Sequence, residues 1–292
     1  MPLPAAINAA ITRATGATFQ PVRQQRIGGG CINQSFQLAD AQRSFFVKLN
    51  DASRLAMFEA EAAGLHEIAS TQSVRAPLPL CHGVADGQVF LVLEYLELRS
   101  HGDAAMLGQQ LAQMHRQVQN YFGGPRDNTL GSTLQSNTQT PDWLHFLREQ
   151  RLGFQLRLAA ENGYGGKLQT QGEKLVTNLD CFFTDYQPQA SLLHGDLWGG
   201  NHAYLADGTP VIFDPAVYYG DRECDLAMTE LFGGFAPAFY AAYQAAWPLD
   251  PGYAERKTLY NLYHILNHAN LFGGGYPAQA LQMIARLNAR LG

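Results

Sequence analysis

The sequence predicts an α+β fold in which a β-rich first part is followed by a mostly helical second part. Residues 45–49 (FFVKL) and 88–96 (QVFLVLEYL) are rich in the aromatic and β-branched side chains that favour strands. Residues 57–69 are rich in Ala, Glu and Leu and predict a helix between these strands. We therefore expect two lobes, an N-terminal lobe of residues 1–96 and a C-terminal lobe of residues 97–292, with a ligand-binding cleft between them.

Helical patterns dominate the second part. An amphipathic helix is expected where apolar residues recur at helical spacing, at Leu107, Leu111, Met114 and Val118. Residues 143–160 and 174–186 are also expected to be helical, and helices should return after a short β segment at residues 202–213.

The composition is that of an ordinary soluble protein. A formal net charge of −5 argues against a nucleic-acid partner, which would need a basic face. No apolar run approaches the roughly 18 residues of a membrane span. The cysteines form no C-x-x-C pair, and residues 1–16 lack the pattern of a signal peptide. We expect a cytoplasmic monomer or homodimer with no membrane partner.

A Gly-rich loop over residues 194–201 (HGDLWGGN) carries the most chemical information. It leads into two short strands around Asp207-Gly208, a dipeptide that favours two-residue hairpin turns. In such a hairpin Asn201 would lie opposite Asp214. An amide oxygen beside a carboxylate suits Mg²⁺, which prefers oxygen ligands. Asp196, on the loop that enters the hairpin, would then be the base that accepts a hydroxyl proton.

This pattern resembles the catalytic loop of kinases, H-x-D-x-x-x-x-N, followed by a metal-binding Asp. His194-Gly195-Asp196 stands in place of H-R-D, and Asp214-Pro215-Ala216 in place of D-F-G. Both departures are typical of small-molecule kinases of the aminoglycoside phosphotransferase and choline kinase type. The resemblance implies a two-lobed, protein-kinase-like fold that uses ATP and Mg²⁺.

The triphosphate of a nucleotide needs its own binding groups. The glycine run Gly28, Gly29 and Gly30 predicts a turn whose backbone N–H groups approach phosphate. Lys48 resembles the strand lysine that holds the α- and β-phosphates. Its partner is expected to be Glu61, with Glu59 as the alternative, because a small alignment error exchanges them.

The kinase resemblance also implies where the adenine binds. It lies against the segment after the second strand and takes backbone hydrogen bonds from Glu94, Tyr95 and Leu96. Cys31, inside the glycine turn, raises the hypothesis of a redox brake, because a thiol among N–H groups has a lowered pKa. Oxidation of Cys31 would then block ATP binding.

A closer resemblance, over nearly the whole chain, is to the fructosamine kinase (ketosamine-3-kinase) family. It is carried by residues 28–33 (GGGCIN), 194–201 (HGDLWGGN), 214–235 (DPAVYYGDRECDLAMTELFGGF) and 262–276 (LYHILNHANLFGGGY). The resemblance implies ATP-dependent phosphorylation of the 3-hydroxyl of ketosamines on lysine, free or protein-bound. Elimination of that phosphate would free the amine, so the enzyme would reverse glycation. Ribulosamine, erythrulosamine and fructosamine all remain candidate substrates.

The same resemblance implies further roles. His194 and Asp225 would brace the catalytic loop. Aromatic residues, on which sugars stack, could line the acceptor pocket: Trp198, Tyr219, Phe232, His268 and Tyr276. The alternative is that these residues form the core of the lobe.

Two other functions compete with a ketosamine kinase. One is a kinase of the same fold that acts on another alcohol, such as an aminoglycoside or a choline-like amine. Those enzymes usually place acidic residues around a cationic ligand, whereas the C-terminal part here is rich in Gly and aromatic residues. The other is a binding protein without activity, which the presence of the lysine, base and metal residues disfavours.

Overall fold

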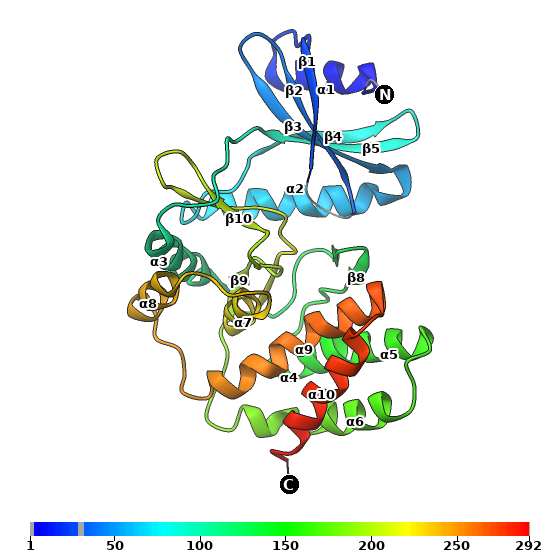
Figure 1. Cartoon of the computed structure of the whole chain (residues 1–292), viewed down its shortest axis with the longest axis vertical. Helices are drawn as coiled ribbons and strands as arrows, with labels where there is room; N and C mark the ends of the chain where they lie inside the picture. Colours follow the sequence, from blue (N-terminus) through cyan, green and yellow to red (C-terminus); the bar gives the residue numbers. More distant parts are fainter. Residues whose placement is uncertain (1–2, 29–31, 292) are drawn as a thin grey trace. The chain divides into compact units, whose positions relative to one another are not determined.

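The computed structural model describes residues 3–28 and 32–291 (Figure 1). The chain divides into two compact units, the first of residues 1–103 and 202–215 and the second of residues 104–201 and 216–292. The expected boundary at residue 96 therefore needs two corrections. The segment up to Asp103 stays with the first unit, and so does the hairpin of residues 202–213, because both pack against that unit.

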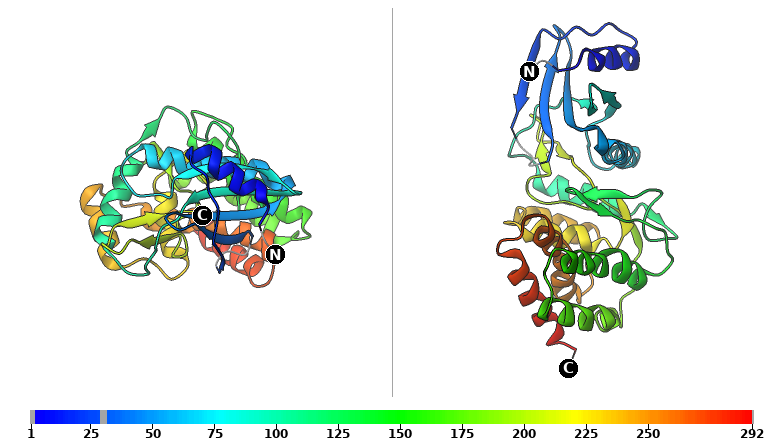
Figure 2. Two further views of the ribbon diagram at one scale, coloured as in Figure 1. Left: turned by 90° about the horizontal axis from the view of Figure 1, so that it is seen from above. Right: turned by 90° about the vertical axis from the view of Figure 1, so that its right-hand side faces the viewer.

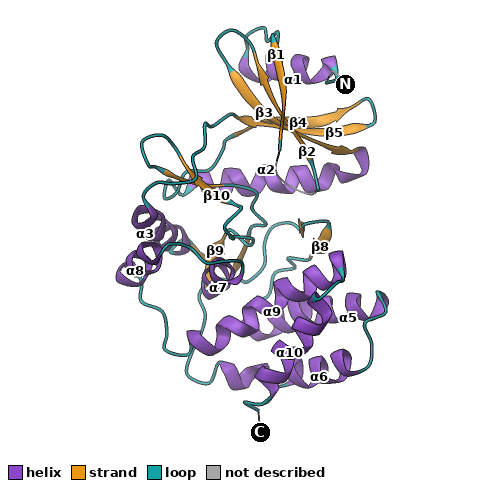
Figure 3. Cartoon of the chain, viewed as in Figure 1, coloured by secondary structure: helices purple, strands orange, loops and turns teal. Residues whose placement is uncertain are grey.

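The first unit contains a five-stranded antiparallel sheet in the order β1-β2-β3-β5-β4 (Figure 3). Its helices are α1 and α2, which pack against β4 and, for α2, also β5. The bounds of its elements are α1 (Ala5–Thr15), β1 (Arg23–Ile27), β2 (Gln34–Ala39), β3 (Ser44–Asp51), η1 (Ala52–Arg54), α2 (Leu55–Ser70), β4 (Pro79–Ala85), β5 (Gln88–Glu94), β10 (His202–Tyr204) and β11 (Pro210–Ile212).

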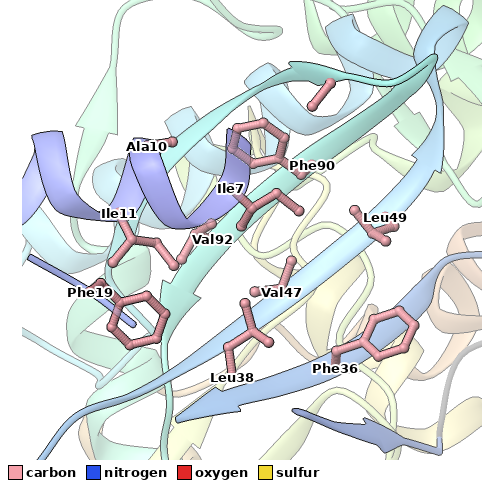
Figure 4. Close-up of a cluster of buried hydrophobic side chains, with 11 residues drawn as sticks. Ile7, Ala10, Ile11, Phe19, Phe36, Leu38, Val47, Leu49, Phe90 and Val92 are labelled. Carbon is pink, nitrogen blue, oxygen red and sulfur yellow. The ribbon is translucent and has the colours of Figure 1, made fainter. Parts of the chain in front are cut away.

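The core of the first unit lies between α1 and one face of the sheet (Figure 4). Ile7 and Ile11 of α1 are fully buried against Val47, Leu49 and Val92. Because side chains alternate across a strand, Val47 and Leu49 share this face while Lys48 points to the opposite face. The packing of one face thus directs the lysine to the other.

The β10–β11 hairpin is fixed to the first unit by backbone contacts. Val211 forms a bridge with Arg75, and Tyr204 forms one with Arg99. Gly102 lies against the Tyr204 ring so closely that a Cβ at residue 102 would fall 2.3 Å from the ring carbons. A side chain there would push the tyrosine away, so the glycine permits this close packing.

The second unit is mostly helical (Figure 3), with α10 packed beside α9 and α6 (Figure 2). Strands β6 and β12 flank β9 in a small antiparallel sheet. The bounds of its elements are α3 (Ala104–His115), β6 (Val118–Gln119), β7 (Asn128–Leu130), β8 (Thr133–Gln135), α4 (Trp143–Phe146), η2 (Leu147–Leu152), α5 (Gly153–Glu161), α6 (Lys167–Thr177), η3 (Leu179–Phe182), β9 (Ala190–Leu193), β12 (Tyr218–Gly220), α7 (Glu223–Leu231), α8 (Pro237–Ala246), α9 (Tyr253–Phe272) and α10 (Tyr276–Asn288).

Several expected elements differ in the structure. The helix α1 was not predicted. Val118 is exposed in β6 rather than buried on the helix of Leu107, which ends at His115. The helix expected at residues 174–186 lies instead at residues 167–177. Among the described residues, no helix is both long and apolar enough to span a bilayer.

Candidate active site

In the first unit, a buried lysine lies between two carboxylates. Lys48 Nζ is 2.6 Å from Glu61 Oε1 and 2.5 Å from Asp214 Oδ1. Glu61, on α2, is the carboxylate that the sequence favoured over Glu59 as the partner. Burial lowers the pKa of Lys48, but the two carboxylates outweigh it and raise that pKa overall. Lys48 is therefore held in its charged form.

Burial also raises the pKa of Glu61, and the nearby charge of Asp214 acts in the same direction, while Lys48 lowers it. The side chain of Glu61 is 10% exposed, whereas that of Asp214 is 46% exposed. Asp214 is thus the one of the two carboxylates that is open to a ligand.

Asp214 has an unusual backbone conformation. Its φ of 58° lies in the left-handed region, which few residues other than glycine adopt. Asp tolerates this region better than most residues, and backbone strain of this kind clusters at functional sites. The turn directs the carboxylate to Lys48, which is 166 residues away in the sequence.

The register of the hairpin corrects the expected pairing of Asn201 with Asp214. His202 pairs with Ile212 and Tyr204 with Pro210, so a continued ladder would place Asn201 opposite Phe213. Gly208 has a φ of 87°, and its N–H donates to Leu205 O, while Leu205 N–H donates to Thr209 O. Asp207-Gly208 therefore lies in a three-residue loop with a left-handed glycine, not in a two-residue turn.

Three of the residues expected to bind the nucleotide phosphates or to sense redox state (Gly29, Gly30 and Cys31) lie outside the described residues. Gly28 directly follows β1, and a Cβ added to it would meet no heavy atom within 4 Å. Asn50 Nδ2 donates to Asn33 Oδ1 at 2.7 Å and to Ile32 O at 3.2 Å. These bonds fix the start of β2 to β3, two residues beyond Lys48.

The segment expected to contact adenine begins at the end of β5. Glu94 N–H donates to Leu78 O at 2.9 Å, and the Glu94 side chain pairs with Arg75. Its N–H is thus already used within the first unit. Tyr95 and Leu96 follow as half-buried residues outside the strand.

In the second unit, the catalytic-loop residues follow the fully buried strand β9. Asp225, at the start of α7, accepts hydrogen bonds from His194 N–H at 2.7 Å and Gly195 N–H at 2.9 Å. Gly195 has a φ of 82°, and a Cβ there would lie 2.1 Å from Ala216 O. Only glycine fits this position. The conformation of the loop therefore depends on Gly195 and on the hydrogen bonds from its backbone to Asp225.

The base candidate and the amide candidate of the loop contact each other. Asn201 Nδ2 donates to the backbone O of Asp196 at 2.8 Å and lies 3.4 Å from Asp196 Oδ2. Because the Nδ2 atom is used in this way, the Oδ1 atom of Asn201 is the one that could bind a cation. His194 Nδ1 accepts a hydrogen bond from Asp196 N–H at 3.2 Å.

Two residues behind the brace, His115 and Tyr243, were not predicted from the sequence. His115 Nε2 lies 3.1 Å from Asp225 Oδ2, and His115 Nδ1 lies 2.8 Å from the hydroxyl of Tyr243. Burial acts to raise the pKa of Asp225, but the bond and charge of His115 help to lower it overall. His115 falls four residues after Leu111 on the apolar face of α3. A polar residue on the apolar face of a predicted helix can be recognised in the sequence, and this pattern would have singled out His115.

Four of the five aromatic residues expected in the acceptor pocket form one cluster. Trp198 and Phe232 have ring centroids 6.3 Å apart, Phe232 and His268 5.1 Å, and His268 and Tyr276 5.0 Å. Tyr219 lies in β12, where it is buried with its ring centroid 5.8 Å from that of Tyr121. Tyr219 is thus a core residue.

The imidazole of His268 is oriented by the backbone. Its Nδ1 lies 2.8 Å from the carbonyl oxygen of His264, one turn earlier in α9. A carbonyl oxygen only accepts, so Nδ1 carries the proton. In the neutral ring, Nε2 is therefore an acceptor for a hydroxyl group.

Comparison with known proteins identifies relatives along nearly the full chain. The family described as fructosamine kinase matches residues 3–290. A probable ketoamine kinase of Synechocystis sp. is 49% identical over 277 residues, which cover 94% of this chain and 93% of the relative. A chloroplastic protein-ribulosamine 3-kinase of Oryza sativa is 43% identical over 262 residues, covering 88% of this chain and 76% of the relative.

Solved structures agree in fold. A candidate fructosamine-3-kinase of Haemophilus somnus superposes with a TM-score of 0.88 at 31% identity, with 96% of each chain covered. The aminoglycoside phosphotransferase APH(2'')-Ib has a TM-score of 0.63 at 12% identity, with 96% of this chain and 99% of that one covered, so it shares the fold alone. The fold is thus the two-lobed kinase-like fold, with a β-rich N-terminal lobe and a mostly helical C-terminal lobe. The chain belongs to the fructosamine kinase family.

Proposed function

We propose that this protein is an ATP- and Mg²⁺-dependent kinase that phosphorylates the 3-hydroxyl of ketosamines. The observation that carries the proposal is the buried contact of Lys48 with both Glu61 and Asp214. A strand lysine paired with a helix carboxylate, together with an aspartate that can hold Mg²⁺, is the arrangement that kinases use to bind a triphosphate. The names of the relatives, ketoamine kinase and ribulosamine 3-kinase, support the choice of acceptor.

Asp196 is the proposed base. Phosphoryl transfer depends mainly on positioning and charge stabilisation, so the base must only orient the hydroxyl and accept its proton. Asn201 holds Asp196 through its Nδ2 atom, and Asp225 holds the preceding backbone. These bonds fix the base before substrate arrives.

The side-chain oxygens of Asn201 and Asp214 are the proposed Mg²⁺ ligands. Both are hard oxygen donors, which fit the cation. The amide nitrogen of Asn201 is used within the loop, and the carboxylate of Asp214 is 46% exposed. When bound, Mg²⁺ neutralises charge on the phosphates during transfer.

The first unit is the proposed nucleotide-binding part. Lys48 would hold the phosphates, and Gly28, Gly29 and Gly30 would approach them with backbone N–H groups. The adenine would take hydrogen bonds from the Glu94 carbonyl and from the backbone of Tyr95 and Leu96. The second unit would then bind the acceptor.

The chemistry of the product explains why C3 is the useful position. Tautomerisation of a 1-amino-2-ketose to its 1,2-enaminol allows a phosphate at C3 to leave as inorganic phosphate. Hydrolysis of the resulting imine then frees the amine and leaves a deoxyosone. A single phosphorylation would thus lead to deglycation of the lysine.

An ATP-consumption assay tests the proposal. Ribulose-lysine, erythrulose-lysine and fructose-lysine are compared with kanamycin and choline. We expect turnover with at least one ketosamine, and a loss of about 10²-fold or more in kcat for Asp196→Asn. Turnover of kanamycin or choline alone would instead make the protein a kinase of another alcohol.

A further inference from the structure

Two aromatic side chains stand out by their exposure. Among the described Phe, Trp and Tyr residues, only Trp198 and Phe272 are exposed, at 39% and 57%. All the others are buried or half-buried. Exposed aromatic rings are costly in water and often mark a binding surface.

These two side chains belong to one connected cluster. Phe272 has its ring centroid 5.5 Å from that of His268, and His268 contacts Phe232, which contacts Trp198. We call the rings of Trp198, Phe232, His268, Tyr276 and Phe272 the aromatic track. It starts two residues beyond Asp196 and ends at the most exposed ring.

Two residues of the aromatic track, Phe232 and Phe272, each lie at the end of a helix and are each followed by a pair of glycines. Phe232 follows α7 and precedes Gly233 and Gly234, which have φ values of 97° and 76°. Phe272 ends α9 and precedes Gly273 and Gly274, with φ values of 63° and 61°. Left-handed glycines end a helix and turn the chain away. Each aromatic residue is therefore presented at a helix end.

The start of the track is also fixed. A Cβ at Gly200 would lie 2.3 Å from the Trp198 indole, so the glycine lets this ring fold over its own loop. Because Trp198 lies in the loop of Asp196, this end of the track is next to the proposed base. The Phe272 end is farther along the ring contacts and more open to solvent.

We propose that the Phe272 end of the aromatic track binds the four-carbon stem of the lysine that carries the ketosamine. This inference rests on the proposed function. The sugar would occupy the end near Trp198, because its hydroxyl must reach Asp196. The amine side of the substrate then extends along the track, and lysine stems readily pack on apolar and aromatic surface. The track would thus select lysine-linked adducts over adducts of short amines.

Two substrates with the same sugar test the inference. The ribulose adducts of Nα-acetyl-lysine and of methylamine differ only in the stem and its backbone. For Phe272→Ser we expect the KM of the lysine adduct to rise on the order of tenfold. The KM of the methylamine adduct should stay within about twofold of wild type, and kcat should be unchanged for both.

Control variants separate binding from folding. Phe272→Leu keeps apolar surface and should recover most of the KM. Leu134→Ser changes a residue of similar exposure, 51%, outside the track and should leave both KM values unchanged. Thermal unfolding of each variant shows whether the fold is intact.

Three outcomes would overturn the inference. The first is an equal change in KM for both adducts, or no change in either. The second is a change in sedimentation of Phe272→Ser, which would mean that a second copy of the chain covers the ring. The third is a wild-type enzyme that phosphorylates the methylamine adduct as well as the lysine adduct, with equal KM. Failure of wild type with the ribulose, erythrulose and fructose adducts of both amines would refute the proposed function itself, and the inference with it.

Discussion

Asp225 Oδ2 accepts a hydrogen bond from the backbone N–H of His194 at 2.7 Å, although the two residues are 31 positions apart. Both residues are fully or almost fully buried. The same carboxylate also binds the Gly195 N–H and His115 Nε2. A single side chain thus supports the loop that carries Asp196.

Replacing this brace should destabilise the fold. In Asp225→Ala, three buried donors lose their acceptor, and each costs about 1–3 kcal/mol when left unpaired. We expect a loss of at least about 3 kcal/mol in the free energy of unfolding, measured by urea denaturation, and a large fall in kcat. Asp225→Asn keeps one acceptor oxygen and should lose less. A stability for Asp225→Ala within about 1 kcal/mol of wild type would contradict the brace.

The contact between Lys48 and Glu61 predicts an effect on ATP binding. Glu61→Gln removes one of the two negative charges beside Lys48 Nζ and leaves Asp214 as the remaining carboxylate. Lys48 would then turn toward Asp214, so we expect the KM for ATP to rise on the order of tenfold, or about 1.4 kcal/mol. Glu59→Gln, two residues earlier on α2, is the matched control. Equal effects of the two variants would show that Glu61 has no special role.

A buried histidine predicts how stability depends on pH. Burial lowers the pKa of His264 to about 3, and the neighbouring His268 adds to this shift. A lowered pKa means that His264 binds a proton less readily in the folded protein than in the unfolded chain. The stability that depends on neutral His264 is therefore present above about pH 6.5 and is lost as the pH falls toward 3. Each unit in that window should cost about 1.4 kcal/mol.

Urea unfolding at several pH values measures this slope. His264→Phe removes the titrating group, and its Nδ1 has no hydrogen-bond partner to lose among the described residues. We expect a shallower loss of stability between pH 6.5 and 4 than in wild type. His145→Phe, at an exposed position, should keep the wild-type slope. An unchanged slope in His264→Phe would show that other groups dominate.

The conformation of Gly195 predicts a strong steric effect. In Gly195→Ala the new Cβ would fall 2.1 Å from Ala216 O at a φ of 82°. Backbone strain of this kind costs of order 1–3 kcal/mol, and displacement of the loop should also reduce kcat. Gly199→Ala, in the same loop, has no atom within 4 Å of its Cβ and should unfold with wild-type stability. Thermal unfolding of the two variants distinguishes them.

Much of the fold was predictable because its signals are local. The strand with Lys48 and the helix with Glu61 follow from β-branched, aromatic and helix-forming residues. The hairpin after Asn201 was predicted, but its register was wrong by one residue. A dipeptide favours a turn, whereas the length of the loop depends on which residues pair, and Leu205 pairs with Thr209 here.

The sequence by itself determined the fold class, the residue types of the catalytic loop and the family. Only the tertiary structure decided that Asp214 contacts Lys48, that His115 supports Asp225, and that Tyr219 is buried against Tyr121. The physical reason is that propensity and turn chemistry act over a few residues. Contacts between residues 110 or 166 positions apart depend instead on how whole helices and strands pack.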